Sequence, residues 1–237
     1  MTVEYQIRDF IAANNAPGMT SVNARAAITD LQSLLVGDEV SQWVREGRVF
    51  FAHDGSLAGE PSDPKIFRPA TLIRQQPQFM IRTAAGVVIV PLGSMLAFEA
   101  TSAVLEVLVS CCDNDPGVAN MTEVEPINAN SRFAGVLSSA CTTYAMDATT
   151  AGNTGTAPTN VVDLLREYHQ ADRDAITGAP TPPIIYSPRV GRGQECVIGN
   201  DAEVHAFLFY GVAGVASASS GFSIHCWAEF TYDEYYG

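Results

Sequence analysis

The chain contains 237 residues, of which 47% are hydrophobic and 16% are charged, so it is too apolar to be intrinsically disordered. That length allows one large all-β domain or two small domains, and such a core needs no disulfide bonds. The formal net charge of −13 comes from 13 basic and 26 acidic residues. Because binding to a nucleic acid backbone rests on clustered lysine and arginine, we expect no direct nucleic acid contact.

The first fifth of the chain is predicted to be helical, and residues 1–47 are assigned to an N-terminal helical segment. Residues 21–36 have apolar side chains at a 3.6-residue spacing, which predicts an amphipathic helix; these are Ala24, Ala27, Ile28, Leu31, Leu34 and Leu35. A second short helix is expected over 38–46, because glycine is typical of helix ends and Gly47 follows this segment.

From residue 48 onward, apolar and polar residues tend to alternate, which is typical of strands, and 48–237 is assigned to one β domain. Strands are predicted over 48–53, 66–74, 78–83, 87–91, 94–100, 103–112, 133–146, 183–188, 195–198, 203–213 and 222–232.

The last predicted strand has the clearest alternation, which indicates one buried face and one exposed face. The residues expected to be more buried are Phe222, Ile224, Cys226, Ala228 and Phe230. The residues expected to be less buried are Ser223, His225, Glu229 and Thr231.

One helix is predicted within the β domain, over 161–171, with Asn160 as its cap and Val161, Leu164, Leu165 and Tyr168 on its apolar face. Strands in succession with a single inserted helix argue against a parallel α/β fold. The predicted fold class is therefore all-β, a jelly-roll sandwich or barrel with an N-terminal helical segment and one inserted helix.

The five cysteines are predicted to be buried free thiols, because their number is odd and most lie in apolar strand-like segments; they are Cys111, Cys112, Cys141, Cys196 and Cys226. Adjacent residues in a strand point to opposite faces, so the pair at 111–112 is interpreted as structural rather than redox-active. The N-terminal sequence does not resemble a signal peptide, and no apolar stretch predicts a transmembrane helix.

The sequence predicts no catalytic, cofactor-binding or metal site, and we expect that the protein is not an enzyme. Its histidines, His53, His169, His205 and His225, form no metal-binding motif. A hairpin centred near 216–220 would place His205 opposite about residue 231 rather than opposite His225.

Two short motifs leave an alternative open. Asp113 and Asp115 have the spacing of ligands for a hard cation such as Ca²⁺, but an Asx-type turn before Pro116 is favoured. Arg189 and Arg192 flank a glycine in a segment that is either an anion site or, as we favour, a β turn.

Two parts of the chain resemble viral jelly-roll capsid proteins. One is the apolar run over 87–109, which leads into an Asp/Asn/Pro/Gly loop, and the other is the pair of strands over 203–213 and 222–232, with its aromatic-rich end. In this pattern the chain is similar to the single jelly-roll major capsid proteins of membrane-containing icosahedral viruses, of the sphaerolipovirus type, that infect halophilic archaea.

The acidic composition selects this group among capsid proteins. Subunits that package nucleic acid directly usually carry a basic arm, which neither end of this sequence shows, and the opening Met1 argues against a polyprotein fragment. Lys65 is the only lysine, which fits a salt-rich host cytoplasm, although a GC-rich genome would also favour arginine over lysine.

The resemblance implies an icosahedral shell in the virion, built as a homo-oligomer or together with a second related capsid protein. It also implies a viral membrane beneath the shell, no cofactor and no small-molecule substrate. The alternatives are a β-sandwich module that binds a ligand or carbohydrate, of the lectin or receptor-binding type, and a cupin-like or hydrolytic jelly-roll enzyme. A cupin needs clustered His and Glu ligands, and a lectin needs exposed aromatic residues in loops, whereas Trp43 and Trp227 fall in predicted elements.

Overall fold

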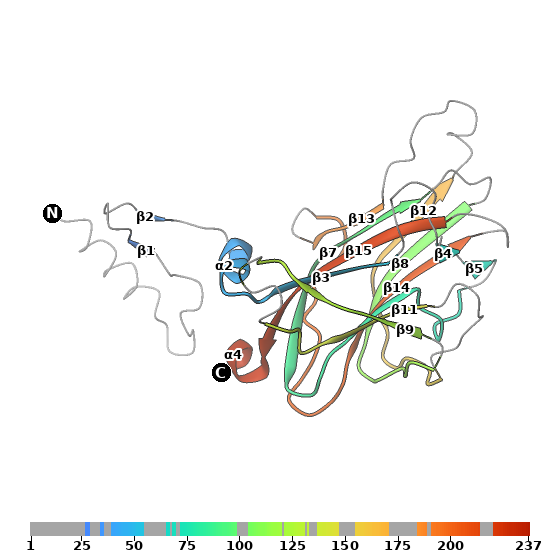
Figure 1. Ribbon diagram of the computed structural model, residues 1–237. Coiled ribbons are helices and arrows are strands. Elements are labelled where there is room, and N and C mark those ends of the chain that lie inside the picture. The colour runs from blue at the N-terminus through green and yellow to red at the C-terminus, as the bar shows by residue number, and fades with distance from the viewer. Residues whose placement is uncertain are drawn as a thin grey trace.

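The computed structural model describes residues 27–28, 34–35, 39–54, 65–66, 68–69, 72–98, 104–119, 121–130, 132, 137–146, 155–170, 184–188, 191–213 and 220–237. Within them the protein is mostly β, with two largely antiparallel sheets that lie against each other and two short helices (Figure 1). The all-β prediction is confirmed at this level.

The first sheet has the strand order β10-β3-β15-β7-β13, and β4 pairs with one end of β15. Its strands are β3 (Val49–Asp54), β4 (Lys65–Ile66), β7 (Val87–Phe98), β10 (Ile127–Asn128), β13 (Ile184–Tyr186) and β15 (Ser220–Thr231). The two long strands β7 and β15 pair along most of their length, with one register shift between Cys226 and Trp227.

The second sheet has the strand order β12-β8-β14-β6-β11-β9, and β5 pairs in parallel with the end of β14. Its strands are β5 (Arg68–Pro69), β6 (Phe79–Arg82), β8 (Val104–Cys112), β9 (Met121–Val124), β11 (Thr142–Met146), β12 (Val162–Gln170) and β14 (Ala206–Ala213). Among the described strands β12 ends the order, so its outer side is an edge of the sheet there.

The main core fills the space between the two sheets with apolar and aromatic side chains. Phe50 and Trp227 of the first sheet lie near each other, with ring centroids 6.4 Å apart. His225 is fully buried and stacks on Phe79 of the second sheet at 4.0 Å, with Phe209 edge-on at 4.9 Å. Tight packing of this kind leaves side chains rather than an open chamber between the described strands.

The two faces of β15 are the reverse of the sequence prediction for most of the strand. Ser223, His225 and Glu229, which we expected to be less buried, are at most 7% exposed. Ile224 and Cys226, which we expected to be in the core, are only half-buried. Trp227 is 0% exposed and decides the orientation, because the largest apolar side chain of the strand lies between the sheets.

Hydrogen bonds make burial of the polar face of β15 tolerable, since a buried polar group without a partner destabilises the fold. The two ring nitrogens of His225 lie 2.9 Å from Ser94 Oγ and 3.1 Å from Ser223 Oγ. Glu229 accepts hydrogen bonds from Trp227 Nε1 at 2.7 Å and from the backbone N–H of Ala140 at 2.8 Å. For three other residues of the set the prediction is confirmed, since Ala228 and Phe230 are buried and Thr231 is exposed; the side chain of Phe222 is outside the described residues.

The two predicted N-terminal helices had different outcomes. Of the helix predicted over 21–36, the structure describes β1 (Ala27–Ile28) and β2 (Leu34–Leu35), which pair antiparallel, so the prediction is wrong at these residues. The apolar pairs Ala27–Ile28 and Leu34–Leu35 lie seven residues apart, a spacing that fits two short strands as well as one face of a helix. The second helix is confirmed as α2 (Glu39–Arg45), and Gly47 follows it with a φ of 75°, a conformation that glycine adopts without strain.

The helix predicted over 161–171 is wrong, because β12 (Val162–Gln170) pairs with β8 along this segment. A register shift between Asp163 and Leu165 marks a β-bulge, and both Leu164 and Leu165 pack on the main core. Two successive inward residues interrupt the alternation and produce a spacing that resembles a helix.

The remaining strand predictions are mostly confirmed in position. The segments predicted at 87–91 and 94–100 form the single strand β7, and in 66–74 and in 133–146 half of the described residues lie in strands. Strands β9 and β10 were missed, and the segment at 195–198 contributes only an isolated bridge between Ile198 and Ile89.

Candidate functional site

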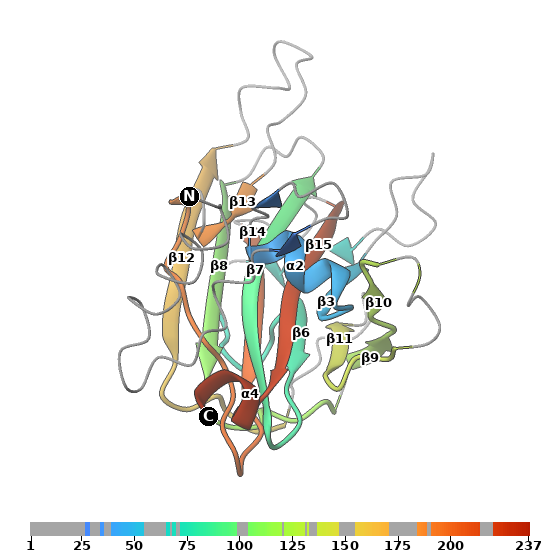
Figure 2. The same ribbon diagram turned by 90° about the vertical axis from the view of Figure 1, so that its left-hand side faces the viewer.

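The most developed surface feature lies where α2 and α4 (Tyr232–Tyr236) cover the outer face of the first sheet. Figure 2 looks onto this side, with both helices in front of β7 and β15. Trp43 of α2 is buried against Phe230, with ring centroids 5.1 Å apart in an edge-on arrangement. Helix α2 is therefore attached to the sheet by a small apolar core of its own, and Tyr235 of α4 packs on the same Phe230, with ring centroids 5.6 Å apart.

The start of α4 is stabilised by a capping box. The backbone N–H of Glu234 donates to the Thr231 side chain, and the Glu234 carboxylate accepts from the Thr231 backbone N–H at 2.9 Å. This arrangement satisfies two of the N–H groups that a helix start leaves unpaired. It turns the chain sharply from the last strand into a helix that would be too short to be stable alone.

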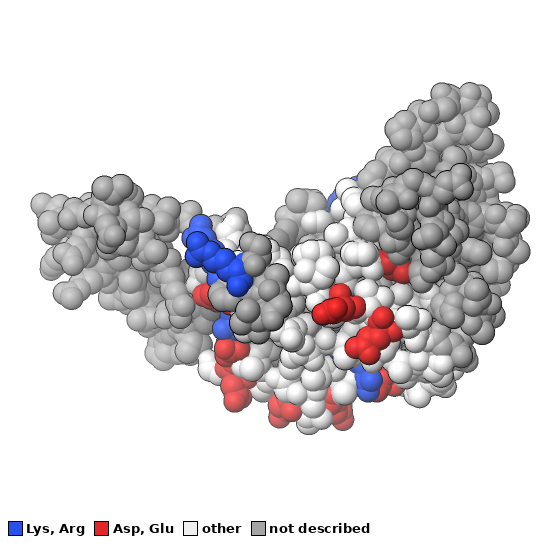
Figure 3. Space-filling model, viewed as in Figure 1, with Lys and Arg blue, Asp and Glu red and all other residues white. Residues whose placement is uncertain are grey.

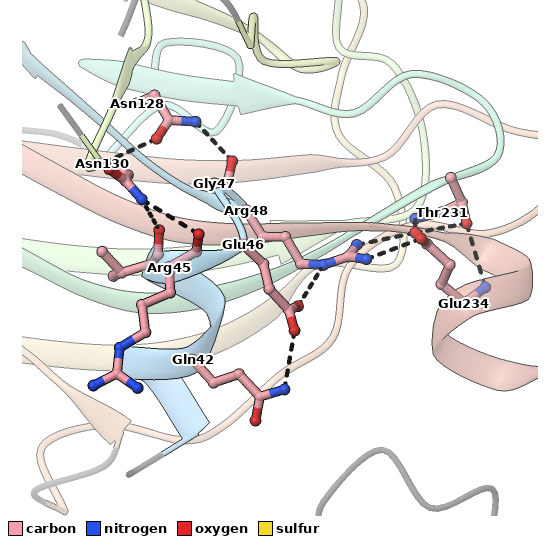
Figure 4. Close-up of polar contacts among 10 residues, drawn as sticks. Gln42, Arg45, Glu46, Gly47, Arg48, Asn128, Asn130, Thr231 and Glu234 are labelled. Carbon is pink, nitrogen blue, oxygen red and sulfur yellow. Dashed lines mark hydrogen bonds and ion pairs between the residues drawn. The ribbon is translucent and has the colours of Figure 1, made fainter. Parts of the chain in front are cut away.

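Arg48 connects the two helices, as Figure 4 shows. Its guanidinium donates to Glu46 at 3.0 Å and to both carboxylate oxygens of Glu234 at 3.0 and 2.9 Å. Chiefly because of the hydrogen bonds from Arg48, the pKa of Glu234 is lowered to about 2. The pair is a two-point ion pair that fixes α4 relative to the segment after α2.

Two asparagines hold the C-terminal end of α2 in the same region (Figure 4). Asn128 donates to the carbonyl of Gly47 at 2.6 Å, and Asn130 donates to the carbonyls of Val44 at 3.0 Å and Arg45 at 3.3 Å. Carbonyls at a helix end lack partners within the helix, so these side chains supply them.

A half-open cleft of about 370 Å³ lies beside this corner, and we name it the α2–α4 cleft. Glu39 and Trp43 line it from α2, and Tyr235 lines it from α4. The other walls are Val90 and Pro91 of β7 and residues of the segment that follows β13, namely Pro188, Glu195, Cys196 and Val197.

The α2–α4 cleft is acidic. The pKa of Tyr235 is raised, first by burial, then by Tyr236, and then by the negative charges of Glu39 and Glu195. Both carboxylates therefore act on the same phenol, although they come from different segments of the chain. The cleft combines this negative potential with aromatic and apolar walls.

The histidines do not come together. His225 lies on β15 in the first sheet, whereas His205 directly precedes β14 in the second sheet, so the hairpin we expected between these two segments does not form. His53 is exposed on β3, and the side chain of His169 is outside the described residues. In the part of the chain that is described, no group of three or more His, Cys, Asp or Glu side chains is placed to hold a metal ion.

The remaining motifs have structural roles. Asp115 accepts from the backbone N–H of Gly117 at 2.9 Å, which is the Asx-type turn we favoured, and it also pairs with Arg82. Asp113 accepts from Thr159 at 2.8 Å. Both carboxylates thus have protein partners where a cation was the alternative.

The two adjacent cysteines point to opposite faces of β8, as predicted. Cys112 is buried in the cluster on the outer face of the second sheet, whereas Cys111 packs on the main core. All five cysteines are free, and burial raises the pKa of Cys112 to about 11. In the glycine-rich segment, the N–H of Gly191 donates to the carbonyl of Pro188 at 2.9 Å, which is a turn.

Neither α2 nor α4, the helices within the described residues, is long and apolar enough to cross a membrane. A comparison with models of known protein families finds no match, and a comparison with curated proteins finds none either.

Proposed function

We propose that the two sheets form a jelly roll and that the protein is a structural subunit that assembles into an icosahedral virus shell. The support begins with eight strands, in chain order β3, β6, β7, β8, β12, β13, β14 and β15. The first pairs with the eighth, the second with the seventh, the third with the sixth and the fourth with the fifth, all antiparallel.

Two further antiparallel pairs join these four hairpin-like pairs into sheets. They are β7 with β15 and β8 with β14. This order is expected when one long antiparallel hairpin wraps around itself, and it supports the proposed jelly roll, a fold used by capsid proteins, lectins and cupins. The strand pairing is the single observation that carries the proposal, and β9 to β11 are then additions at the sheet edges.

Among the functions of this fold, a shell subunit agrees best with the rest of the molecule. A cupin uses the space between its sheets for metal and substrate, whereas here that space holds Trp227, Phe79 and Phe209. A lectin would present aromatic side chains from loops, but Trp43 and Trp227 are both buried within elements.

The edge strand β12 supports association between copies. It is nine residues long, and Val162 and Tyr168 on it are 50% and 61% exposed. A long edge strand with exposed apolar side chains favours contact with another chain. The partners we propose are other copies of the chain, with or without a second related capsid protein.

The charge supports a shell that does not contact the genome directly. The formal net charge is −13. On the face shown in Figure 3, acidic side chains are scattered over the lower part, and the largest group of basic side chains lies beside α2. An underlying viral membrane would separate such a shell from the nucleic acid.

Substitution on β12 tests the association directly. Tyr168→Asp should reduce particle formation at molar salt, because it places a charge in an apolar contact. The control Thr122→Asp adds the same charge to an exposed position on β9, at the opposite end of the sheet order. Particle yield is measured by sedimentation and negative-stain microscopy. Equal loss in both variants, or no loss in either, would contradict a role of β12 in assembly.

A further inference from the structure

Two of the free cysteines, Cys111 and Cys196, lie against each other although they are far apart in the sequence. Their side chains are hydrogen-bonded to each other, and the Tyr186 side chain is hydrogen-bonded to Cys196 as well. Both cysteines are half-buried and pack against the main core. Cys112, the sequence neighbour of Cys111, lies on the opposite face of β8 and so cannot take part in this contact.

Backbone and ring contacts place the two cysteines at the same end of the main core. Cys111 on β8 is directly opposite Phe207 on β14, and the ring centroids of Phe207 and Tyr186 are 6.0 Å apart. The Tyr186 hydroxyl donates to the carbonyl of Gln194 at 2.9 Å, and Gln194 is close to Cys196 in the chain. The other strand beside β8 holds the same segment, because the N–H of Gln194 donates to a carbonyl of β12 at 2.9 Å.

The thiol pair is asymmetric, and Cys111 is its more reactive member. The pKa of Cys111 is lowered, chiefly because Cys196 donates a hydrogen bond to its sulfur, and the backbone N–H of Val162 adds another. The same contact, together with burial, raises the pKa of Cys196. Because the thiolate is the nucleophile, Cys111 is the sulfur that attacks an oxidant, and Cys196 keeps its proton for the following step.

A small oxidant reaches this pair from the side of Cys196. This residue lines the α2–α4 cleft, which is half open and has a volume of about 370 Å³. Its chain neighbours Glu195 and Val197 are exposed, so the segment lies at the surface. Hydrogen peroxide is little larger than water and needs no wider opening than this cleft offers.

We propose that hydrogen peroxide oxidises Cys111 and Cys196 to a disulfide that joins the segment after β13 to β8. First the Cys111 thiolate attacks one peroxide oxygen, so that an S–O bond forms and the O–O bond breaks. The hydroxide that leaves takes up the proton that Cys111 released and becomes water, and Cys111 is now a sulfenic acid. The Cys196 sulfur then attacks the Cys111 sulfur, an S–S bond forms, and the hydroxyl group leaves with the Cys196 proton as a second water.

This modification does not depend on the proposed capsid function. A reducing cytoplasm keeps thiols free, so the disulfide forms only when the chain meets the oxidant. The segment after β13, held in the reduced chain by hydrogen bonds to β12 and β7, is then held covalently as well.

Peptide mapping of the full chain by mass spectrometry tests the bond. Peroxide should remove two of the five free thiols and give one linked peptide pair with Cys111 and Cys196, which a reductant separates. In concentrated urea this selectivity should disappear, because it depends on the fold. Cys226→Ser is the matched control, since it removes another half-buried cysteine, on β15, and should keep the linked pair. Thiol loss spread evenly over the cysteines, or no linked pair, would overturn the proposal.

Two single variants test which sulfur attacks first. In Cys196→Ser the sulfenic acid on Cys111 has no second thiol to react with, while serine still offers a hydrogen-bond donor beside it. Dimedone, which labels sulfenic acids, should therefore label Cys111 in this variant at least about tenfold more than it labels Cys196 in Cys111→Ser. Equal labelling in the two variants would refute the assigned roles.

The disulfide should also raise the melting temperature, because it links residues that are far apart in the chain. We expect an increase of about 5–15 °C after oxidation, which a reductant reverses. Cys111→Ser and Cys196→Ser should show no such increase after the same treatment. An unchanged or lower melting temperature of the cross-linked chain would contradict the placement of these two sulfurs for a bond in the folded structure.

Discussion

Replacement of His225 by glutamine should remove a specific part of the pH dependence of stability. Burial lowers the pKa of His225 to about 3 from its ordinary 6.5. The folded chain therefore keeps the ring neutral, while the unfolded chain takes up a proton below about pH 6.5. The stability that depends on a neutral ring is complete above about pH 6.5 and is lost as the pH falls from there toward 3.

The size of this effect follows from the linkage between protonation and folding. Each pH unit below the pKa of the unfolded histidine lowers the free energy of unfolding by about 1.4 kcal/mol. A change from about pH 7.5 to about pH 5.5 includes about one such unit, so it should cost the natural chain about 1.4 kcal/mol through this residue. The His225→Gln variant lacks this loss, because glutamine does not titrate. At about pH 7.5 the variant should be less stable by about 1–3 kcal/mol, since hydrogen bonds to Ser94 and Ser223 are weakened.

Urea unfolding followed by tryptophan fluorescence at the two pH values measures the difference. His53→Gln is the matched control, because it removes a histidine that is exposed on β3. It should retain the pH dependence of the natural chain. If His225→Gln loses as much stability as the natural chain between the two pH values, His225 is not the buried neutral group that we describe.

Four further variants test the packing and the α2–α4 corner by thermal or urea unfolding. Gly199→Ala should cost about 2 kcal/mol or more, because φ is +120° and the new Cβ would lie 2.1 Å from a carbonyl oxygen of β7. Gly191→Ala, with φ +75° and nothing within 4 Å, should cost less, and equal costs would contradict the clash. Arg48→Ala should cost only about 1 kcal/mol, less at high salt, because its pair with Glu234 is partly exposed. That contribution is present above the ordinary pKa of Glu234, near 4.5, and is lost as the pH falls toward 2. Trp43→Ala should cost about 3 kcal/mol, and a loss below about 1 kcal/mol would contradict its role as the anchor of α2.

The positions of most strands could be predicted because alternation is a local property of the sequence. The segment of β12 could not, since its bulge brings Leu164 and Leu165 to the same core and only pairing with β8 decides between strand and helix. Which face of β15 is buried was also beyond a local pattern. The neighbours that satisfy its polar side chains, such as Ser94 on β7 and Ala140, are distant in the sequence.

The α2–α4 corner was only partly predictable. The sequence from Thr231 to Glu234 is a capping-box pattern, so α4 had a local signal that we read as the end of a strand. The cleft had none, because Glu39, Glu195 and Tyr235 come from three distant segments. Only the sheet that carries these segments brings their side chains together.

The proposed capsid function is tested most directly by the size of the purified protein as salt is varied. At molar salt the Debye length is about 3 Å, so repulsion between subunits of formal charge −13 is screened, and at 0.01 M it is about 30 Å. Sedimentation velocity with negative-stain microscopy should therefore show closed particles of uniform size at molar salt that dissociate at low salt. A parallel dialysis with Ca²⁺ separates screening from specific cation binding. A chain that stays monomeric at every salt concentration, also when mixed with related capsid proteins, would contradict the function and favour a ligand- or carbohydrate-binding module.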